Sequence, residues 1–345
     1  MTTKKVMVAM SGGVDSSAAA ALLVEQGHDV TGATLRLWGG ASDSGCCSVG
    51  DVEDARRVAA QLDIPHYVFN LADAFEQSVV SPYVAEHAAG RTPNPCVECN
   101  RSIKFGALLD RAEALGFDAL ATGHHARIVT TGDGRYELRR SADRDKDQSY
   151  VLYMLTQHEL SRTMLPIGHL TKREVREHAA RVGLRTAAKP ESMDVCFITR
   201  GGRRRFLDER REPVAGPIVD RVGAVVGHHD GVAHVTIGQR RGLGIAAGDR
   251  RYVVDVCADT ATVTIGERRD LLRDAVRLDG LTWVDAPPAA GTVVSAQVRA
   301  HGEPLAARVE SGGVEFTMPQ PRVAPGQVVA LYDGEALLGG GIAVA

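Results

Sequence analysis

The stretch Val6–Ser17, VMVAMSGGVDSS, joins a short apolar strand to a helical pattern through the glycine-rich turn SGGVDSS. Gly12 and Gly13 allow backbone N–H groups to approach an anion, because no Cβ stands in the way. The positive end of the following helix favours the same anion, and serine hydroxyls can donate further hydrogen bonds to it. The turn is therefore predicted to bind phosphate groups, with Asp15 as a candidate ligand for Mg²⁺.

The loop lacks the lysine of a Walker A sequence, so transfer of a γ-phosphate of that type is not indicated. A plainer interpretation is a glycine-rich turn with a serine cap. The complete seven-residue string, placed between a strand and a helix, favours phosphate binding over that interpretation.

The residues that follow this loop alternate between strand and helix patterns. Such alternation predicts βαβ units, a parallel sheet and helices on both of its faces. Thr171 and Glu174 have capping-box spacing, which predicts a helix through Val182 that stops at Gly183. The other expected strands are Val6–Met10, His28–Leu37, Tyr67–Leu71 and Ala119–Thr122, and the other expected helices are Ser16–Gln26, Val52–Leu62, Asp73–Ala88 and Ile103–Leu115.

From about Phe206 onward, helical periodicity gives way to frequent glycines and short β-rich segments. We expect a domain over residues 1–205, a small β-rich domain over 206–275, and a small barrel or sandwich over 276–345. The expected strands in these two units are Ala233–Ile237, Tyr252–Val256, Thr262–Ile265, Val293–Arg299, Ala306–Val309, Val314–Met318 and Val328–Tyr332.

Composition excludes several classes of protein. The 345 residues are 44% hydrophobic and 24% charged, which is typical of a globular chain with a sizeable core. The 40 basic and 43 acidic residues argue against non-specific coating of nucleic acid, so any RNA contact needs a local patch. No apolar run approaches the ~18 residues of a membrane span, and a cytoplasmic protein is expected. Six cysteines at this length indicate thiols, metal ligands or catalysts, not a disulfide scaffold.

A second motif, Gly90–Asn100 (GRTPNPCVECN), is predicted to be a long loop that presents Cys96 and Cys99. Its prolines fix φ and stiffen the chain, which suits the positioning of reactive groups. A third thiol, Cys196, lies in Lys189–Phe197 (KPESMDVCF). The C-x-x-C spacing fits a redox pair, a zinc site or part of an iron–sulfur site, and spacing alone leaves these open.

The SGGVDSS string resembles the pyrophosphate loop of ATP pyrophosphatases, which cleave ATP between the α and β phosphates. With the thiol motifs, ATGHH at 121–125, KDQSY at 146–150, TIGQRRGL at 236–243 and LGGG at 338–341, the chain resembles the tRNA-specific 2-thiouridylase family from Val8 onward. The resemblance implies an α/β fold: a doubly wound parallel-sheet domain, a small β-rich adaptor domain and a C-terminal β-barrel that contacts tRNA.

The resemblance also implies a reaction and partners. ATP adenylates O2 of the wobble uridine (position 34) of tRNA, and sulfur from a cysteine persulfide then gives 2-thiouridine. It implies ATP and Mg²⁺ as cofactors. It further implies lysine, glutamate and glutamine tRNAs as substrates, and a cysteine desulfurase or relay protein as sulfur donor.

Site residues follow from the same resemblance. Cys99 is the implied nucleophile and Cys196 the implied persulfide carrier. The implied nucleotide site comprises Ala9, Met10, Ser11, Gly12, Gly13, Val14, Asp15, Ser16, Leu35 and Gly123. The implied tRNA contacts are Asn94, Pro95 and Cys96 at the target base, with His124, Lys146, Asp147, Gln148, Arg299 and Ala300 elsewhere.

One departure leaves two sulfur schemes open. Many family members have an acidic residue where this chain has Cys96, so Cys96, Cys99 and Cys196 are candidate ligands of a [4Fe–4S] cluster. Adjacent Cys46 and Cys47 are interpreted as plain thiols. An arginine cluster is a candidate phosphate contact, and comprises Arg200, Arg203, Arg204, Arg205, Arg210 and Arg211. Two rival functions are an ATP-dependent synthetase for a small molecule and a non-catalytic RNA-binding protein.

Overall fold

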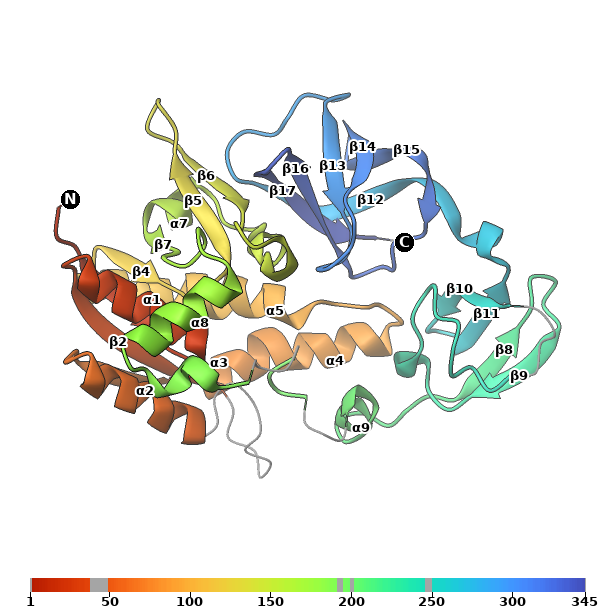
Figure 1. The fold of residues 1–345 in the computed structure, drawn as a ribbon. Helices are drawn as coiled ribbons and strands as arrows, with labels where there is room; N and C mark the ends of the chain where they lie inside the picture. The colour runs from red at the N-terminus through yellow and green to blue at the C-terminus, as the bar shows by residue number, and fades with distance from the viewer. Residues whose placement is uncertain (1, 38–48, 191–194, 199–201, 246–249, 345) are drawn as a thin grey trace.

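The first part of the chain is built on a five-stranded parallel sheet. A computed structural model describes residues 2–37, 49–190, 195–198, 202–245 and 250–344 (Figure 1). The sheet order is β3-β2-β1-β4-β7, so the chain builds outward on one side of β1 and then returns to the other. The strands are β1 (Lys5–Ala9), β2 (Asp29–Arg36), β3 (His66–Asn70), β4 (Ala119–Ala121) and β7 (Thr163–Met164). The crevice between the carboxyl ends of β1 and β4 is where such sheets bind ligands.

Helices cover both faces of this sheet, as predicted. Val6 and Val8 of β1 point into a core formed with α1 (Val14–Glu25), α2 (Val49–Gln61) and α8 (Lys172–Arg181). Met7 points into the opposite core, which two long helices cover. One runs through α3 (Ala72–Phe75), the π-helical η1 (Glu76–Val80) and α4 (Ser81–Ala88), and the other through α5 (Pro95–Glu98), the π-helical η2 (Cys99–Leu108) and α6 (Leu109–Ala114).

The expected long loop Gly90–Asn100 is wrong in its second half. A helix predicted from Ile103 begins at Pro95, so Cys96 and Cys99 lie on a helix. Asn94 caps it, because its Oδ1 accepts from the Cys96 amide at 3.0 Å. Pro95 occupies the first helical position, where a missing N–H costs nothing and the fixed φ suits the helix.

Helix α8 confirms the capping-box prediction. The Thr171 hydroxyl accepts from the Glu174 amide, and the Glu174 carboxylate accepts from the Thr171 amide at 2.7 Å. Gly183 follows the helix with φ +74°, the left-handed conformation that favours glycine at a helix end.

The central unit is a four-stranded sheet of order β10-β11-β8-β9. The expected strand Ala233–Ile237 is wrong, because its start forms the 3₁₀ turn η6 (Val232–His234) and its Thr236 amide bonds to the Gln239 side chain. These strands are β8 (Gly216–Val219), β9 (Val225–His229), β10 (Tyr252–Cys257) and β11 (Thr262–Gly266).

The last unit is a closed six-stranded antiparallel barrel, because β12 pairs with both β15 and β17. Strand β12 begins at Leu272, inside the range expected for the central domain, and its alternating charged residues hide it from a hydrophobic pattern. The strands are β12 (Leu272–Trp283), β13 (Val293–Gln297), β14 (Leu305–Glu310), β15 (Gly313–Pro321), β16 (Val328–Asp333) and β17 (Ala336–Ala343).

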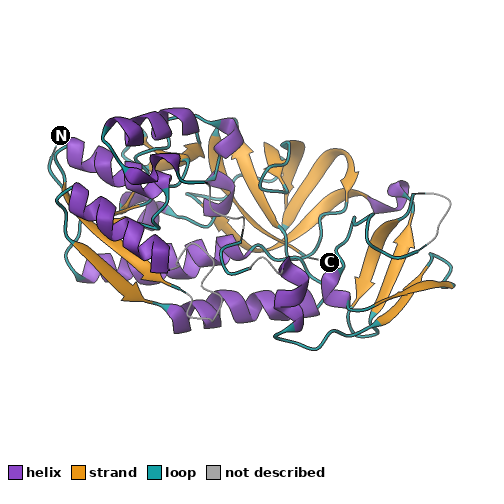
Figure 2. Ribbon diagram, turned by 60° about the horizontal axis from the view of Figure 1, so that its bottom comes forward, coloured by secondary structure: helices purple, strands orange, loops and turns teal. Residues whose placement is uncertain are grey.

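An unpredicted hairpin joins the first unit to this barrel. Strands β5 (Ala126–Thr130) and β6 (Tyr136–Arg140) pair with each other, and β6 also pairs with β17 (Figure 1). Figure 2 shows that most helices lie in the part of the molecule that carries the N-terminus, whereas strands dominate the rest. The remaining short elements are α7 (Gln157–Ser161), α9 (Gly202–Asp208), η3 (Arg144–Lys146), η4 (Ser149–Leu152), η5 (Arg185–Ala188) and η7 (Arg268–Leu271). Within the described ranges no helix is long and apolar enough to traverse a membrane.

Candidate functional site

The glycine-rich loop lies at the carboxyl end of β1, beside the sheet's switch point. Gly12 has φ +70°, and a Cβ on it would lie 2.3 Å from the Asp51 carbonyl oxygen of α2. Gly13 is the N-cap residue of α1 and has no side chain to cap the first-turn amides. Those amides point out of the helix end, where an anion is favoured. The loop geometry thus suits phosphate binding.

Two of the three loop serines stabilise the loop itself. The hydroxyls of Ser16 and Ser17 donate to the Gly13 carbonyl at 3.2 and 2.8 Å, and Ser16 Oγ accepts from the Ser11 amide at 3.1 Å. Ser11 is exposed at the mouth of the loop. Its hydroxyl is therefore the serine group best placed to meet a ligand.

The other residues of the expected nucleotide site gather around the same edge. A Cβ on Gly123, just after β4, would lie 2.6 Å from the Ser16 amide nitrogen, so glycine permits β4 and α1 to approach this closely. Leu35 of β2 is buried in the core against which Ala9 packs. The structure thus brings the ends of β1, β2 and β4 together around the loop.

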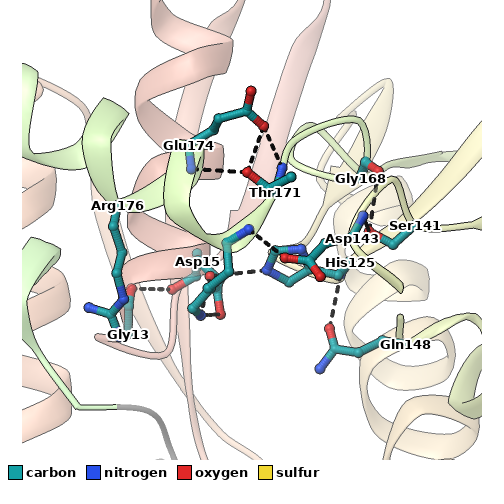
Figure 3. Close-up of polar contacts among 12 residues, drawn as sticks. Gly13, Asp15, His125, Ser141, Asp143, Gln148, Gly168, Thr171, Glu174 and Arg176 are labelled. Carbon is teal, nitrogen blue, oxygen red and sulfur yellow. Dashed lines mark hydrogen bonds and ion pairs between the residues drawn. The ribbon is translucent and has the colours of Figure 1, made fainter. Parts of the chain in front are cut away.

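Asp15 is held by a lysine that the sequence analysis did not single out. Lys172, the first residue of α8, donates from Nζ to both Asp15 carboxylate oxygens at 2.7 Å, and His125 Nε2 lies 3.3 Å from Oδ1 (Figure 3). Burial raises the pKa of Asp15, but the hydrogen bonds from His125 and Lys172 and the lysine charge outweigh it, so the pKa falls below its usual value. The capping box was the available signal, since it places Lys172 at the helix start.

This pairing has two chemical consequences. Lys172 bonds to both Asp15 oxygens, and the Asp15 side chain remains 31% exposed, so a cation at Asp15 would share the carboxylate with Lys172. Lys172 also brings to the loop the positive charge that its sequence lacks compared with a Walker A loop.

A second lysine ties the segment before Cys196 to the loop. Lys189 Nζ donates to the Gly12 carbonyl at 3.0 Å and to the carboxylates of Asp51 and Asp54 at 2.7 and 2.6 Å. Burial lowers its pKa, but the two carboxylates outweigh burial and raise it. The loop, α2 and the start of the thiol-bearing segment therefore meet at one ammonium group.

The thiols lie around one core. Cys99 is 8% exposed and belongs to the same packed cluster as Leu35, while Cys196 packs against that cluster. Cys96 lies one turn earlier on the Cys99 helix, and all three are thiols in the structure. Cys46 and Cys47 lie outside the described residues.

An aromatic cluster anchors the end of the Cys196 segment. The Phe197 ring lies 5.4 Å from Tyr83, 5.7 Å from Phe75 and 5.1 Å from Phe206, measured between centroids. Burial raises the pKa of Tyr83 to about 12, an effect that Arg203 opposes and the nearby Cys96 reinforces. Tyr83 therefore lies beside Phe197 and near Cys96.

The residues expected to contact tRNA differ in their accessibility. His124 is buried, its Nδ1 lies 2.6 Å from the Thr122 hydroxyl, and burial with the charge of Lys104 holds its pKa well below the usual value. The Asp147 side chain is only 6% exposed, whereas Gln148 and Arg299 are exposed and Lys146 and Ala300 are half-buried. Asn94 and Pro95 form the capped start of the Cys99 helix.

The arginine cluster is partly neutralised. Arg204 pairs with Asp230, Arg205 with Glu209, and Arg210 lies over the Phe206 ring at 4.1 Å. Arg200 lies outside the described residues. A uniformly basic RNA-binding face is therefore not what α9 presents.

Comparison with known proteins covers nearly the whole chain. Family models match as a tRNA methyl transferase HUP domain over residues 4–200, a tRNA methyl transferase PRC-barrel domain over 204–267 and an aminomethyltransferase beta-barrel domain over 273–343. The tRNA-specific 2-thiouridylase MnmA of Chloroflexus aurantiacus (strain ATCC 29366 / DSM 635 / J-10-fl) is 51% identical over 97% of each chain. That of Herpetosiphon aurantiacus is 49% identical over 98% of this chain and 97% of its own.

Among solved structures, a 4-thiouridine synthetase in complex with RNA and bound ATP matches 56% of this chain and 44% of its own. The TM-score is 0.38 and the sequence identity 19%.

Replacing Lys172 should weaken nucleotide binding. In Lys172→Met, we expect the affinity for the uncleavable analogue α,β-methylene-ATP, measured by titration calorimetry, to fall by about tenfold, because a charge-assisted contact is lost. Lys172→Arg should retain most of the affinity. Arg173→Met is the matched control, since that side chain is 80% exposed one residue further on. Wild-type affinity in Lys172→Met would contradict this role.

His87, whose ring centroid lies 4.5 Å from that of Tyr83 in the aromatic cluster, should make the stability of the protein depend on pH. Burial, together with the charges of Arg203 and His234, lowers the pKa of His87 from 6.5 to about 4. Below pH 6.5 the His87 side chain therefore binds a proton in the unfolded chain but not in the folded chain. The free energy of unfolding consequently falls as pH drops from 7 towards 4. In His87→Leu the slope of unfolding free energy between pH 6 and 4.5 should flatten by about 1 kcal/mol per pH unit.

Urea denaturation at several pH values measures this slope. Tyr83→Phe is the control, because the pKa of Tyr83 is about 12 and the hydroxyl stays protonated throughout. An unchanged slope in His87→Leu, or an equal change in Tyr83→Phe, would refute the assignment to His87.

Proposed function

Because the chain belongs to the tRNA-specific 2-thiouridylase family, we propose that it is an ATP-dependent tRNA-uridine 2-sulfurtransferase acting on the wobble uridine, position 34. The observation that carries the proposal is a phosphate-type loop in one domain with Cys99 and Cys196, which contact the same hydrophobic cluster as Leu35 and Ala9, in a chain about half identical to its relatives over nearly its full length. The proposed products are 2-thiouridine, AMP and pyrophosphate.

In the first proposed step, the uridine O2 attacks the α-phosphorus of ATP and pyrophosphate leaves. The loop Ala9–Ser16 offers uncapped amides at the start of α1, and Lys172 adds a positive charge beside them. Donors and charges fixed before the reaction stabilise negative charge as it develops on the leaving group. Leu35 and Gly123 complete the proposed nucleotide site at the adjoining strand ends.

In the second step, the terminal sulfur of a persulfide on Cys196 attacks C2 of the adenylated uridine, and AMP leaves. Cys99 then attacks the Cys196 sulfur, which breaks the remaining S–S bond, releases 2-thiouridine and leaves a Cys99–Cys196 disulfide. A thiol reductant reopens the disulfide. Contact of both thiols with the same hydrophobic cluster supports this scheme.

The reaction requires a sulfur donor and tRNA substrates. The persulfide sulfur comes from a cysteine desulfurase or a relay protein. The substrates are the lysine, glutamate and glutamine tRNAs, contacted through Asn94–Cys96, His124, Lys146–Gln148, Arg299 and Ala300. A cytoplasmic setting suits the scheme, since thiols are kept reduced there.

The alternative iron–sulfur scheme has less support. Among the described residues, no group of three or more His, Cys, Asp or Glu side chains is placed to hold a metal ion. The arrangement of Cys96, Cys99 and Cys196 therefore does not present a cluster site as it stands, and we derive no step through one. Mg²⁺ bound to the ATP phosphates stays part of the proposal, with Asp15, which is 31% exposed and shared with Lys172, as its candidate ligand.

The central prediction is that pyrophosphate release requires tRNA. Release should occur with a lysine tRNA transcript, fail with a transcript carrying cytidine at the wobble position, and be absent without RNA. Release without RNA would favour the rival small-molecule synthetase.

Cys99→Ser and Cys196→Ser should each abolish thiolation, whereas Cys257→Ser, in the central sheet, should retain it.

Iron analysis tests the sulfur scheme. We expect anaerobically purified protein without iron to thiolate tRNA from a persulfide donor, and Cys96→Ala to remain active. Stoichiometric iron and acid-labile sulfide that vanish in Cys96→Ala, together with thiolation, would overturn the persulfide scheme in favour of the cluster.

A further inference from the structure

A line of polar contacts, joined at one step by the adjacent residues Asp147 and Gln148, runs from the C-terminal barrel to the phosphate loop. Its barrel end is Gln297, the last residue of β13, which is 4% exposed. The Gln297 Nε2 donates to the carbonyls of Arg299 and Ala300 at 3.0 and 2.9 Å, which closes the turn after the strand. Its Oε1 accepts from Arg140 Nη1 at 2.7 Å.

Arg140, the last residue of β6, carries the line into the first unit. The same Nη1 donates to Asp147 Oδ2 at 2.9 Å, and the guanidinium carbon lies 3.6 Å from the Tyr332 ring centroid. The Arg140 side chain is 9% exposed. A buried charge is tolerated only with good partners, so Asp147, Gln297 and Tyr332 together define where this guanidinium lies.

Asp147 organises the loop between β6 and η4. Its Oδ1 accepts from the amides of Ser141 and Ser149 at 2.9 and 3.2 Å, and its Oδ2 accepts from the Ser149 hydroxyl at 2.9 Å. Because Ser149 gives its hydroxyl hydrogen to this carboxylate, the Tyr332 hydroxyl, 3.0 Å away, donates to Ser149. Barrel side chains thus act on this loop at two points.

The next residue, Gln148, connects this loop to His125, which lies beside the phosphate loop. Its amide donates to the His125 carbonyl at 2.8 Å, and its Oε1 accepts from the His125 amide at 2.9 Å. These two bonds fix the backbone of His125, whose Nε2 lies 3.3 Å from Asp15 Oδ1.

We propose that Gln297 and Arg140 are positioning residues that make the geometry of His125 and Asp15 depend on the barrel turn at Arg299 and Ala300. The link to RNA rests on the proposed function, which places that turn at the tRNA. Occupation of the turn by RNA then favours the nucleotide-binding arrangement of the loop, and ATP turnover becomes dependent on substrate RNA.

The chain contains a matched control for simple docking of the two units. Gln157 of α7 also bridges them with its amide, donating to the carbonyls of Tyr136 and Val284 at 2.7 and 3.1 Å. Within the described residues, its side-chain hydrogen bonds go to Tyr136 and Val284 and not to Asp147 or His125. Gln157→Leu therefore removes a comparable bridge without touching the proposed line.

The test uses hydrogen–deuterium exchange of the full chain without RNA. In Gln297→Leu, the amides of Ser141, Ser149 and His125 should exchange about tenfold faster, as expected for loss of one charged hydrogen bond. The Kd for α,β-methylene-ATP should rise about fivefold in the same variant. Gln157→Leu should leave both readouts at wild-type values. Equal effects in the two variants, or none in Gln297→Leu, would overturn the proposal.

Gln297→Glu is the control for a general loss of folding at this position. It keeps an acceptor for Arg140 and loses the two donors to the turn, so protection of Ser141 and Ser149 should be retained. Loss of protection equal to that in Gln297→Leu would contradict the inference. When a lysine tRNA transcript is added, protection of the His125 amide from exchange should rise in the wild-type protein and not in Gln297→Leu. If the wild-type protein thiolates tRNA but shows no such rise, only the link between RNA and the loop would be overturned.

Discussion

The ion pair between Asp15 and Lys172 is the interaction on which the site depends. It joins the start of α1 to the start of α8 across the end of the sheet, and His125 adds a third contact from the turn after β4. The contacts from Lys172 and His125 lower the pKa of Asp15, so this carboxylate stays ionised beside a loop that must bind anions. Lys189 performs a similar task on the other side of the loop, where it meets the Gly12 carbonyl and two carboxylates of α2.

The first unit and the barrel are joined by backbone as well as by side chains. Pairing of β6 with β17 extends the barrel's sheet into the first unit, and Tyr150 donates from its hydroxyl to the Val328 carbonyl at 2.8 Å. Interactions of this kind favour one relative arrangement, since moving the barrel would expose unpaired backbone groups. A loop in the first unit can then fix the position of a side chain in the barrel.

Local sequence patterns predicted the parallel sheet, helix α8 and the phosphate-type loop, because their signals lie within a few residues of each other. The Cys99 helix was placed too late because Pro93 and Pro95 resemble a loop, whereas the cap at Asn94 and a proline at the first helical position begin a helix. Lys172, Lys189 and the β5–β6 hairpin were missed for other reasons. The partners of the two lysines lie more than a hundred residues away, and no local pattern encodes them or the pairing of β6 with β17. The hairpin itself has a local signal, the Gly132-Asp133-Gly134 turn between two strand-like runs, which was overlooked.

The π-helical stretch η2 has a consequence for how the thiols could change in evolution. The ten residues from Cys99 to Leu108 have more residues per turn than an α-helix. They lie between the capped start at Pro95 and α6, whose Leu109 and Ala112 are buried. In an ordinary helix each residue advances the side-chain direction by roughly 100°. The wider winding of a π-helix lets a helix hold an added residue while the turns on either side keep their faces. The thiols and the apolar face of α6 can therefore keep their directions through a change in length that an ordinary helix would not tolerate.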